Sequence, residues 1–158
     1  MIETSTVHFT PEAATRLVPT LRERLERIAR LKSQMVTKAA LFGALSPAGI
    51  RSQKGQEADR RRLSEDLDSQ LDMLNEEMNG IEALGCYARD LDQGLVDFPA
   101  IVAGVEAFLC WTKGEAEVGF WHPRDQGCES RRRLPFRDFE DPSAADPVVV
   151  GTSAGPGR

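Results

Sequence analysis

Two long stretches of this chain carry apolar residues at alternating intervals of three and four, which places them along one face of a helix. The main part of the first stretch covers residues 19–45, with its apolar set beginning at Ala14, and the second stretch covers residues 57–84. Residues 46–56 contain proline, glycine and small polar side chains, which favour a connecting loop. The first set is Ala14, Val18, Leu21, Leu25, Ile28, Lys32, Met35, Ala39 and Phe42, and the second is Leu67, Leu71, Leu74, Met78 and Ile81. The spacing predicts two long helices of coiled-coil character.

The ends of the predicted helices follow from capping residues. Thr10-Pro11-Glu12 is typical of a helix start, because threonine caps free amides and proline has no amide to lose at the first position. Pro19 lacks an amide donor, so we expect a kink or a break near Val18. Gly85 favours termination of the second helix. The predicted helices therefore span residues 10–45, with a kink near residue 19, and residues 57–84.

The two predicted helices carry opposite charge. Residues 10–45 contain seven Lys or Arg and three Glu, for a net charge of +4. Residues 57–84 contain nine Asp or Glu and three Arg, for a net charge of −6. Both helices would be roughly 40 Å long at about 1.5 Å per residue. Matched length and complementary charge predict an antiparallel hairpin. Because a small sheet could not cover so long an apolar stripe, we expect a helical homodimer.

After Gly85 the pattern changes to short apolar runs separated by turns, which predicts a small antiparallel β meander over residues 86–122. Turns are expected at residues 92–94 and 113–115, and Phe98, Trp111 and Trp121 are candidate packing or interaction residues. Residues 123–139 are expected to be irregular, and the Pro- and Gly-rich residues 140–158 to form a flexible tail. The fold class is therefore α+β and mostly α: a long antiparallel helical hairpin, then a small antiparallel β meander and a disordered C-terminal tail. Residues 1–139 are expected to form a single domain.

Composition excludes several classes of protein. The chain has neither a basic, apolar leader nor a run of about 18 apolar residues, so we expect no membrane partner and a cytoplasmic location. In that compartment the three cysteines are expected to be free thiols. The net charge of −5 opposes binding to phosphate backbones. The arginine runs at residues 60–62 and 131–133 therefore favour solvated or helix-facing positions over a nucleic-acid site, and the role of the second run stays open.

Four polar side chains form the candidate site: Asp97, Glu115, His122 and Asp125. A sheet with two turns can bring carboxylates and an imidazole together as metal ligands or as a general acid and base. The competing interpretation is that Asp97 and Glu115 accept hydrogen bonds from turn amides while His122 caps a strand. Cys86, Cys110, Cys128 and His122 are zinc-ligand types, but they lack the close Cys pairs of zinc sites, so no metal or cofactor is expected.

Several segments resemble the uncharacterised bacterial family DUF2203, a domain of unknown function. They are Phe9-Thr10, Ala13-Ala14, Leu17 to Pro19, DLDQGLVDFPA at residues 90–100, FLCWTKGEAEVGFWH at residues 108–122, and Gly127 with a following arginine. The resemblance covers about residues 9–133 and implies no activity. Cys86 and Cys128 do not belong to the family pattern.

The sequence contains no nucleophile motif, P-loop or dinucleotide-binding motif, and two functions remain. The first is a non-enzymatic interaction or scaffold module that acts as a homodimer with an unknown protein partner. The alternative is a small-ligand-binding protein or metal-assisted enzyme with a site near Asp97, Glu115 and His122.

Overall fold

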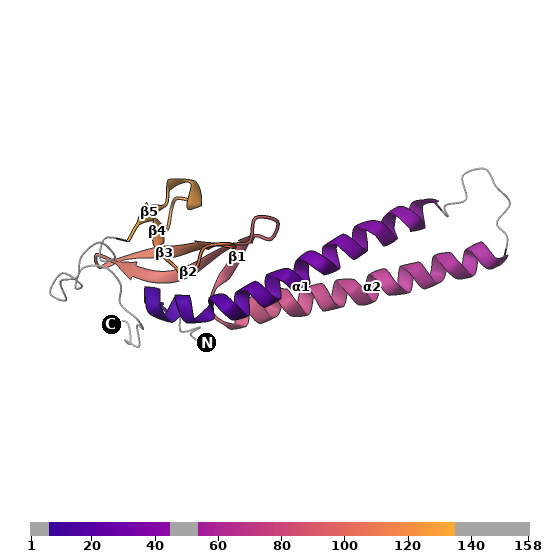
Figure 1. Cartoon of the computed structure of the whole chain (residues 1–158), viewed down its shortest axis with the longest axis horizontal. Helices are drawn as coiled ribbons and strands as arrows, with labels where there is room; N and C mark the ends of the chain where they lie inside the picture. Colours follow the sequence, from indigo (N-terminus) through magenta and orange to yellow (C-terminus); the bar gives the residue numbers. More distant parts are fainter. Residues whose placement is uncertain (1–6, 45–53, 135–158) are drawn as a thin grey trace, which may run out of the picture. The chain divides into compact units, whose positions relative to one another are not determined.

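The computed structural model describes residues 7–44 and 54–134, in which two helices precede a sheet (Figure 1). The expected α+β, mostly helical class is confirmed. Residues 140–158, where a flexible tail was expected, lie outside the described residues. The elements in chain order are α1 (Pro11–Ala44), α2 (Lys54–Ala83), β1 (Tyr87–Asp90), β2 (Leu95–Val102), β3 (Val105–Thr112), β4 (Phe120–Pro123), the 3-10 helix η1 (Cys128–Ser130) and β5 (Arg132–Arg133).

The described residues divide into two compact units. One unit comprises residues 7–23 and 81–134, and is called the sheet unit below; the other comprises residues 24–44 and 54–80, and is called the hairpin unit. Helix α1 contributes its first turns to the sheet unit and its remaining turns to the hairpin unit.

Helix α1 begins as its sequence predicts but continues through its internal proline. The amide of Ala13 donates to Thr10 Oγ1 at 3.1 Å, which is the expected N-terminal cap. Pro19 is exposed and lies inside one uninterrupted helix, so a break near Val18 is wrong, whereas a kink stays a prediction. The helix continues because Val18 and Leu21 on its opposite side are buried and hold both flanking turns in place.

The hairpin unit is antiparallel, as its charge pattern predicts. Polar contacts join successively later residues of α1 to successively earlier residues of α2, and Figure 1 shows these helices side by side within the unit. Most of the contacts are ion pairs between basic α1 and acidic α2. The contacts join Arg24 to Glu77 at 2.9 Å, Arg27 to Glu77 at 2.8 Å, Gln34 to Gln70 at 2.8 Å, and Lys38 to Asp66 at 3.3 Å.

The face that α2 presents to α1 differs from the predicted set at one member, Leu71. Gln70 is buried and donates to Gln34, whereas Leu71 is 46% exposed. One residue corresponds to about 100° of rotation around a helix, so only one of two neighbours can face the partner. On α1 the same effect buries Leu31 beside the half-buried Lys32. The polar Gln34–Gln70 contact therefore occupies a place in the interface that the apolar pattern assigned to Leu71.

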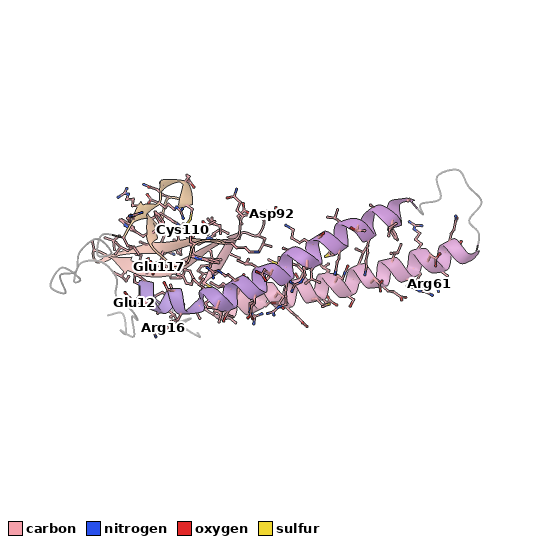
Figure 2. The ribbon with its side chains drawn as sticks, viewed as in Figure 1. Glu12, Arg16, Arg61, Asp92, Cys110 and Glu117 are labelled. Atoms are coloured by element: carbon pink, nitrogen blue, oxygen red, sulfur yellow. A yellow bond between two sulfur atoms is a disulfide. The ribbon has the colours of Figure 1, made fainter. Side chains whose placement is uncertain are left out.

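The three arginines at residues 60–62 of α2 lie in different surroundings. Figure 2 shows Arg61 pointing away from α1, and both Arg61 and Arg62 are exposed. Arg60 instead lies over the Phe42 ring of α1, with its Cζ 4.7 Å from the ring centroid. One member of the run therefore packs across the hairpin while two are solvated.

The sheet is an antiparallel meander with strand order β1-β2-β3-β4-β5. Gly94 (φ 69°) and Gly114 (φ 108°) occupy two predicted turns in the left-handed region that glycine tolerates. A further turn joins β2 to β3 through Ala103 and Gly104, which also have positive φ. Residues 123–134 hold the end of β4, the 3-10 helix η1 and β5, where an irregular segment was expected; residues 135–139 lie outside the described residues.

One face of the sheet forms the core of the sheet unit. Its alternating side chains include Phe98 on β2 and Trp111 on β3, both fully buried, with Ala14 and Val18 of α1 also buried. The amide of Val118 donates to Thr15 Oγ1 at 3.0 Å. The carbonyl of Glu115 accepts from both Trp111 Nε1 at 3.0 Å and Arg22 Nη2 at 2.8 Å. These bonds satisfy the buried indole and join the start of α1 to the segment after β3.

We predict that Leu25→Ala and Leu71→Ala have very different costs, although the sequence pattern placed both residues in the interface. Leu25 is 2% exposed, so its truncation should lower the free energy of unfolding by about 2–5 kcal/mol. Leu71 is half exposed, and its truncation should cost about 0.5 kcal/mol or less. Urea unfolding followed by circular dichroism measures both values. Equal costs for the two variants would contradict this orientation of α2.

Candidate functional site

The second face of the sheet carries polar side chains that the register brings together. Asp97 on β2 is paired directly with Cys110 on β3. His122 on β4 is paired with Phe108, two residues before Cys110, and therefore lies on the same face. Asp97, Cys110 and His122 are all buried. Strand alternation thus gathers a carboxylate, a cysteine and an imidazole on the face opposite the apolar core.

Cys128 reaches this face from η1, which follows the turn after β4. Cys110 and Cys128 form a disulfide with their Cα atoms 6.4 Å apart. The expectation that all three cysteines are free thiols is therefore wrong for this pair, and Cys86 alone is free. The 18-residue separation gave no sign of the bond, because the turn after β4 is what returns the chain to β3. The cytoplasmic location stays a prediction.

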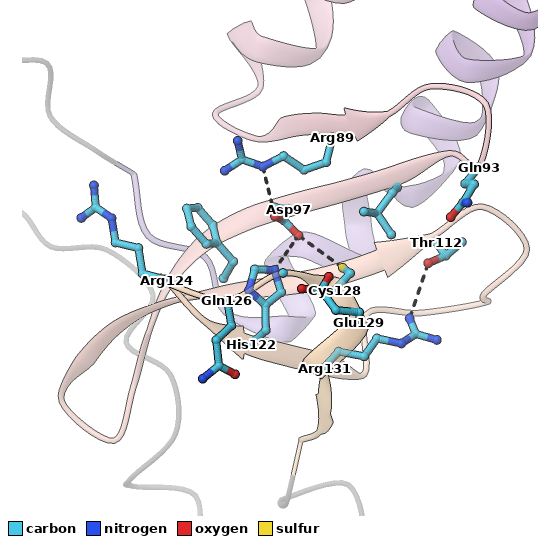
Figure 3. Close-up of a pocket in the computed structure, with 13 residues that line it drawn as sticks. Arg89, Gln93, Asp97, Thr112, His122, Arg124, Gln126, Cys128, Glu129 and Arg131 are labelled. Atoms are coloured by element: carbon cyan, nitrogen blue, oxygen red, sulfur yellow. Dashed lines mark hydrogen bonds and ion pairs between the residues drawn. The ribbon is translucent and has the colours of Figure 1, made fainter.

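Asp97 lies at the centre of the polar contacts (Figure 3). His122 Nε2 is 3.1 Å from Asp97 Oδ1, and Arg89 Nε donates to Asp97 Oδ2 at 3.1 Å. His122 Nδ1 is 2.9 Å from the carbonyl oxygen of Pro123, which can only accept, so Nδ1 carries a proton. The buried carboxylate therefore has one oxygen held by a guanidinium and the other facing an imidazole of fixed orientation.

The structure brings together two of the four predicted site residues. One donor atom from each of Asp97, Cys110, His122 and Cys128 lies within 4.8 Å of the others, so these four side chains could hold a metal ion. Glu115 and Asp125 are not members of this group. Asp125 is exposed in the turn after β4.

Glu115 instead organises the segment after β3. Its Oε2 accepts from the amide of Thr112 at 2.8 Å, and its Oε1 lies 2.8 Å from Arg131 Nη1. These contacts agree with the turn-stabilising interpretation of Glu115. Its carboxylate fixes the end of β3 and the arginine that follows η1.

A cavity of about 680 Å³ lies over the polar face, within the size range of small-ligand sites. Figure 3 shows arginine, glutamine and carboxylate side chains around it. Leu95 and Phe108 add apolar surface to the lining. The charged residues of the lining are Arg89, Arg124, Arg131, Asp97 and Glu129, and its remaining residues are Gln93, Thr112, His122, Gln126, Gly127 and Cys128.

Sequence reasoning missed Arg89, and it set Cys110 and Cys128 aside as metal ligands because they lack close Cys pairs. One available signal was the Ala103-Gly104 step between two apolar runs, because a two-residue turn there pairs Asp97 with Cys110 by counting. Arg89 and Cys128 carry no such signal. Their positions depend on the register shift between Ala88 and Asp90 and on the turn that precedes η1.

Cys86 is chemically separate from the site. It is fully buried, and its Sγ donates to the carbonyl of Ile81 at 3.4 Å. Burial raises the pKa of the Cys86 thiol from 9.0 to about 12, with a backbone hydrogen bond opposing part of that rise. Cys86 is therefore a packing residue rather than a nucleophile or a ligand.

The family comparison agrees with the resemblance of the strand blocks. The chain belongs to the family described as "Uncharacterized conserved protein (DUF2203)", which matches residues 8–134. No curated protein and no solved structure matched the chain. Of the described helices, none contains a stretch long and apolar enough to cross a membrane.

We predict that Cys86 resists alkylation in the folded, unreduced protein. At pH 8 a thiol with a pKa of about 12 has roughly a thousandth of the thiolate of one with a pKa of 9.0. Iodoacetamide labelling followed by mass spectrometry should leave Cys86 unmodified, with a rate that rises about tenfold per pH unit. The same protein in urea should be labelled once. Rapid labelling of folded protein at pH 8 would contradict the burial of this thiol.

Proposed function

We propose that the sheet unit binds a small organic anion, bearing a carboxylate or a phosphate, in the cavity over Asp97 and His122. The observation that carries the proposal is that three arginines, Arg89, Arg124 and Arg131, line this one cavity. Guanidinium groups match carboxylate and phosphate oxygens with paired N–H donors. No reaction is assigned to the site.

Two of these arginines are held in place before any ligand arrives. Arg89 bonds to Asp97 through Nε, and its Cζ lies 5.1 Å from the ring centroids of both Tyr87 and Phe108. Arg131 contacts Glu115 through Nη1, and its Cζ lies 4.0 Å from the Phe120 ring centroid. Each of these contacts uses part of a five-donor group, so further N–H donors remain for a ligand. Fixed donors lose less entropy on binding, which favours affinity.

The charge and polarity of the lining support the same ligand class. Three arginines face the carboxylates of Asp97 and Glu129, which leaves an excess of one positive charge before His122 is counted. Gln93 and Gln126 add amide donors, while Leu95 and Phe108 provide an apolar wall. This lining suits a compact anion with some carbon surface.

A second proposal concerns the hairpin unit, which we propose assembles as a homodimeric scaffold. Two helices alone leave the apolar interface half-buried beyond Leu31. A second hairpin would cover these side chains and complete a four-helix bundle. The half-buried residues are Met35, Phe42, Leu63, Leu67 and Leu74.

For the ligand proposal we predict saturable binding of citrate or pyrophosphate to the disulfide-bonded protein, measured by calorimetry in low salt. Arg124→Gln should weaken binding about tenfold or more, because it removes a charged donor. Arg124 is exposed and pairs with the exposed Glu106, so the fold should survive its replacement. Arg61→Gln on α2 is the matched control and should bind normally. Absence of binding by the unmodified protein at about 10 mM of either anion would refute the proposal.

For the scaffold proposal we predict a dimeric mass at high micromolar concentration in sedimentation equilibrium. Leu67→Asn should shift the equilibrium toward monomer, because it places an amide in the half-buried interface. The exposed Leu71→Asn is its control. A strictly monomeric mass for the unmodified protein would count against self-association.

A further inference from the structure

We propose that the reduced protein binds one zinc ion through Asp97, Cys110, His122 and Cys128, and that the Cys110–Cys128 disulfide is the metal-free, oxidised form of the same site. The inference does not depend on anion binding in the cavity. It concerns the floor of the cavity, where Asp97, His122 and Cys128 of the lining lie with the buried Cys110, and where the four donor atoms are within 4.8 Å of one another.

The donor types fit zinc. Zinc is bound by Cys sulfur, His nitrogen and carboxylate oxygen, and it takes four ligands in a tetrahedral arrangement. Calcium and magnesium require six or more oxygen ligands, which this group does not offer. Two sulfurs, one nitrogen and one oxygen therefore select a borderline-soft, four-coordinate ion.

The distances between donors match the edges of a zinc tetrahedron. With zinc about 2.3 Å from sulfur and about 2.0 Å from nitrogen and oxygen, tetrahedral angles give edges of about 3.3 Å for N···O and about 3.5 Å for S···O. His122 Nε2 lies 3.1 Å from Asp97 Oδ1, and Cys128 Sγ lies 3.7 Å from the same oxygen. In the reduced protein, coordination by both cysteines would set the two sulfurs about 3.8 Å apart. The N···O and S···O distances around Asp97 Oδ1 are therefore already close to coordination spacing in the disulfide form.

The position of the proton on the His122 ring also favours a cation bound between His122 and Asp97. Because Nδ1–H donates to the Pro123 carbonyl, a neutral imidazole turns the lone pair of Nε2 toward Asp97 Oδ1. Two acceptors at 3.1 Å require a proton or a metal ion between them. A backbone carbonyl bonded to the second nitrogen of a metal-bound histidine is the usual supporting contact in zinc sites.

The balance of charges also supports the binding of Zn²⁺ by this buried group. Two thiolates and the carboxylate of Asp97 carry three negative charges in a group whose members are mostly buried. Zn²⁺ and the guanidinium of Arg89, bonded to Asp97 Oδ2, supply three positive charges. The neutral sum avoids the desolvation cost of an unpaired buried charge.

Oxidation by a small-molecule disulfide links the two forms. Cys128 is partly exposed and lines the cavity, whereas Cys110 is fully buried, so a reagent reaches Cys128 first. The two thiolates pass two electrons to the reagent, and the S–S bond of the reagent breaks. The reagent takes up two protons and leaves as two thiols. The Cys110–Cys128 bond forms, and Zn²⁺ is released because two of its four ligands are lost.

The first test is a zinc titration of the full chain after anaerobic reduction and treatment with a chelator. We expect one equivalent of zinc after gel filtration, and cobalt substitution should give the absorption bands of a tetrahedral thiolate site. Cys128→Ser and Asp97→Asn should each weaken zinc binding at least about tenfold while circular dichroism shows an intact fold. Cys86→Ala is the matched cysteine control and should bind normally. Zinc well below one equivalent in the reduced unmodified protein, or normal binding by Cys128→Ser, would overturn the site.

The second test adds oxidised glutathione to the zinc-loaded protein. We expect one zinc to be released for every two thiols lost, and reductant should restore binding. Formation of the Cys110–Cys128 bond with zinc retained would overturn the redox link. Anion binding is measured separately on zinc-free, disulfide-bonded protein, so failure of either proposal can be distinguished from failure of the other.

Discussion

The register of the β2–β3 hairpin is the constraint on which the sheet unit depends. Eight residue pairs join these strands, and the turn at Ala103 and Gly104 fixes which residues face each other. Positive φ at both turn positions matches the natural twist of a two-residue hairpin. A slip of one residue would exchange the two faces. Phe98 would then lose the apolar core, and Asp97 would enter it without its partners.

Glu115 connects the two faces that this register creates. Its backbone carbonyl accepts from Trp111 and Arg22 on the apolar side, while its carboxylate holds the Thr112 amide and Arg131 on the cavity side. A single residue therefore satisfies a buried indole and positions a cavity arginine. This double use explains why a carboxylate that looked like a ligand in the sequence is part of the architecture instead.

The proposed metal and anion sites share a cavity but would be formed by different residues. Zinc would lie on the floor, between strands β2, β3 and β4, whereas the anion would contact arginines of the wall. Zinc with two thiolates has the same formal charge as a neutral disulfide without zinc. Once zinc has left, a proton must lie between His122 Nε2 and Asp97 Oδ1, so oxidation would add one positive charge to the cavity that Arg124 and Arg131 line.

The sequence by itself determined the two helices, their antiparallel pairing and the meander, because period, charge and turn residues are local properties of the chain. It also proposed Asp97 and His122 as members of one polar cluster, and the structure places their side chains 3.1 Å apart. It assigned Leu71 to an interface position that Gln70 occupies, because an apolar pattern does not show where a polar side chain enters the interface. Only the tertiary structure decided that Cys110 and Cys128 meet. Their contact arises from strand register and from the turn before η1, which bring together residues 18 positions apart.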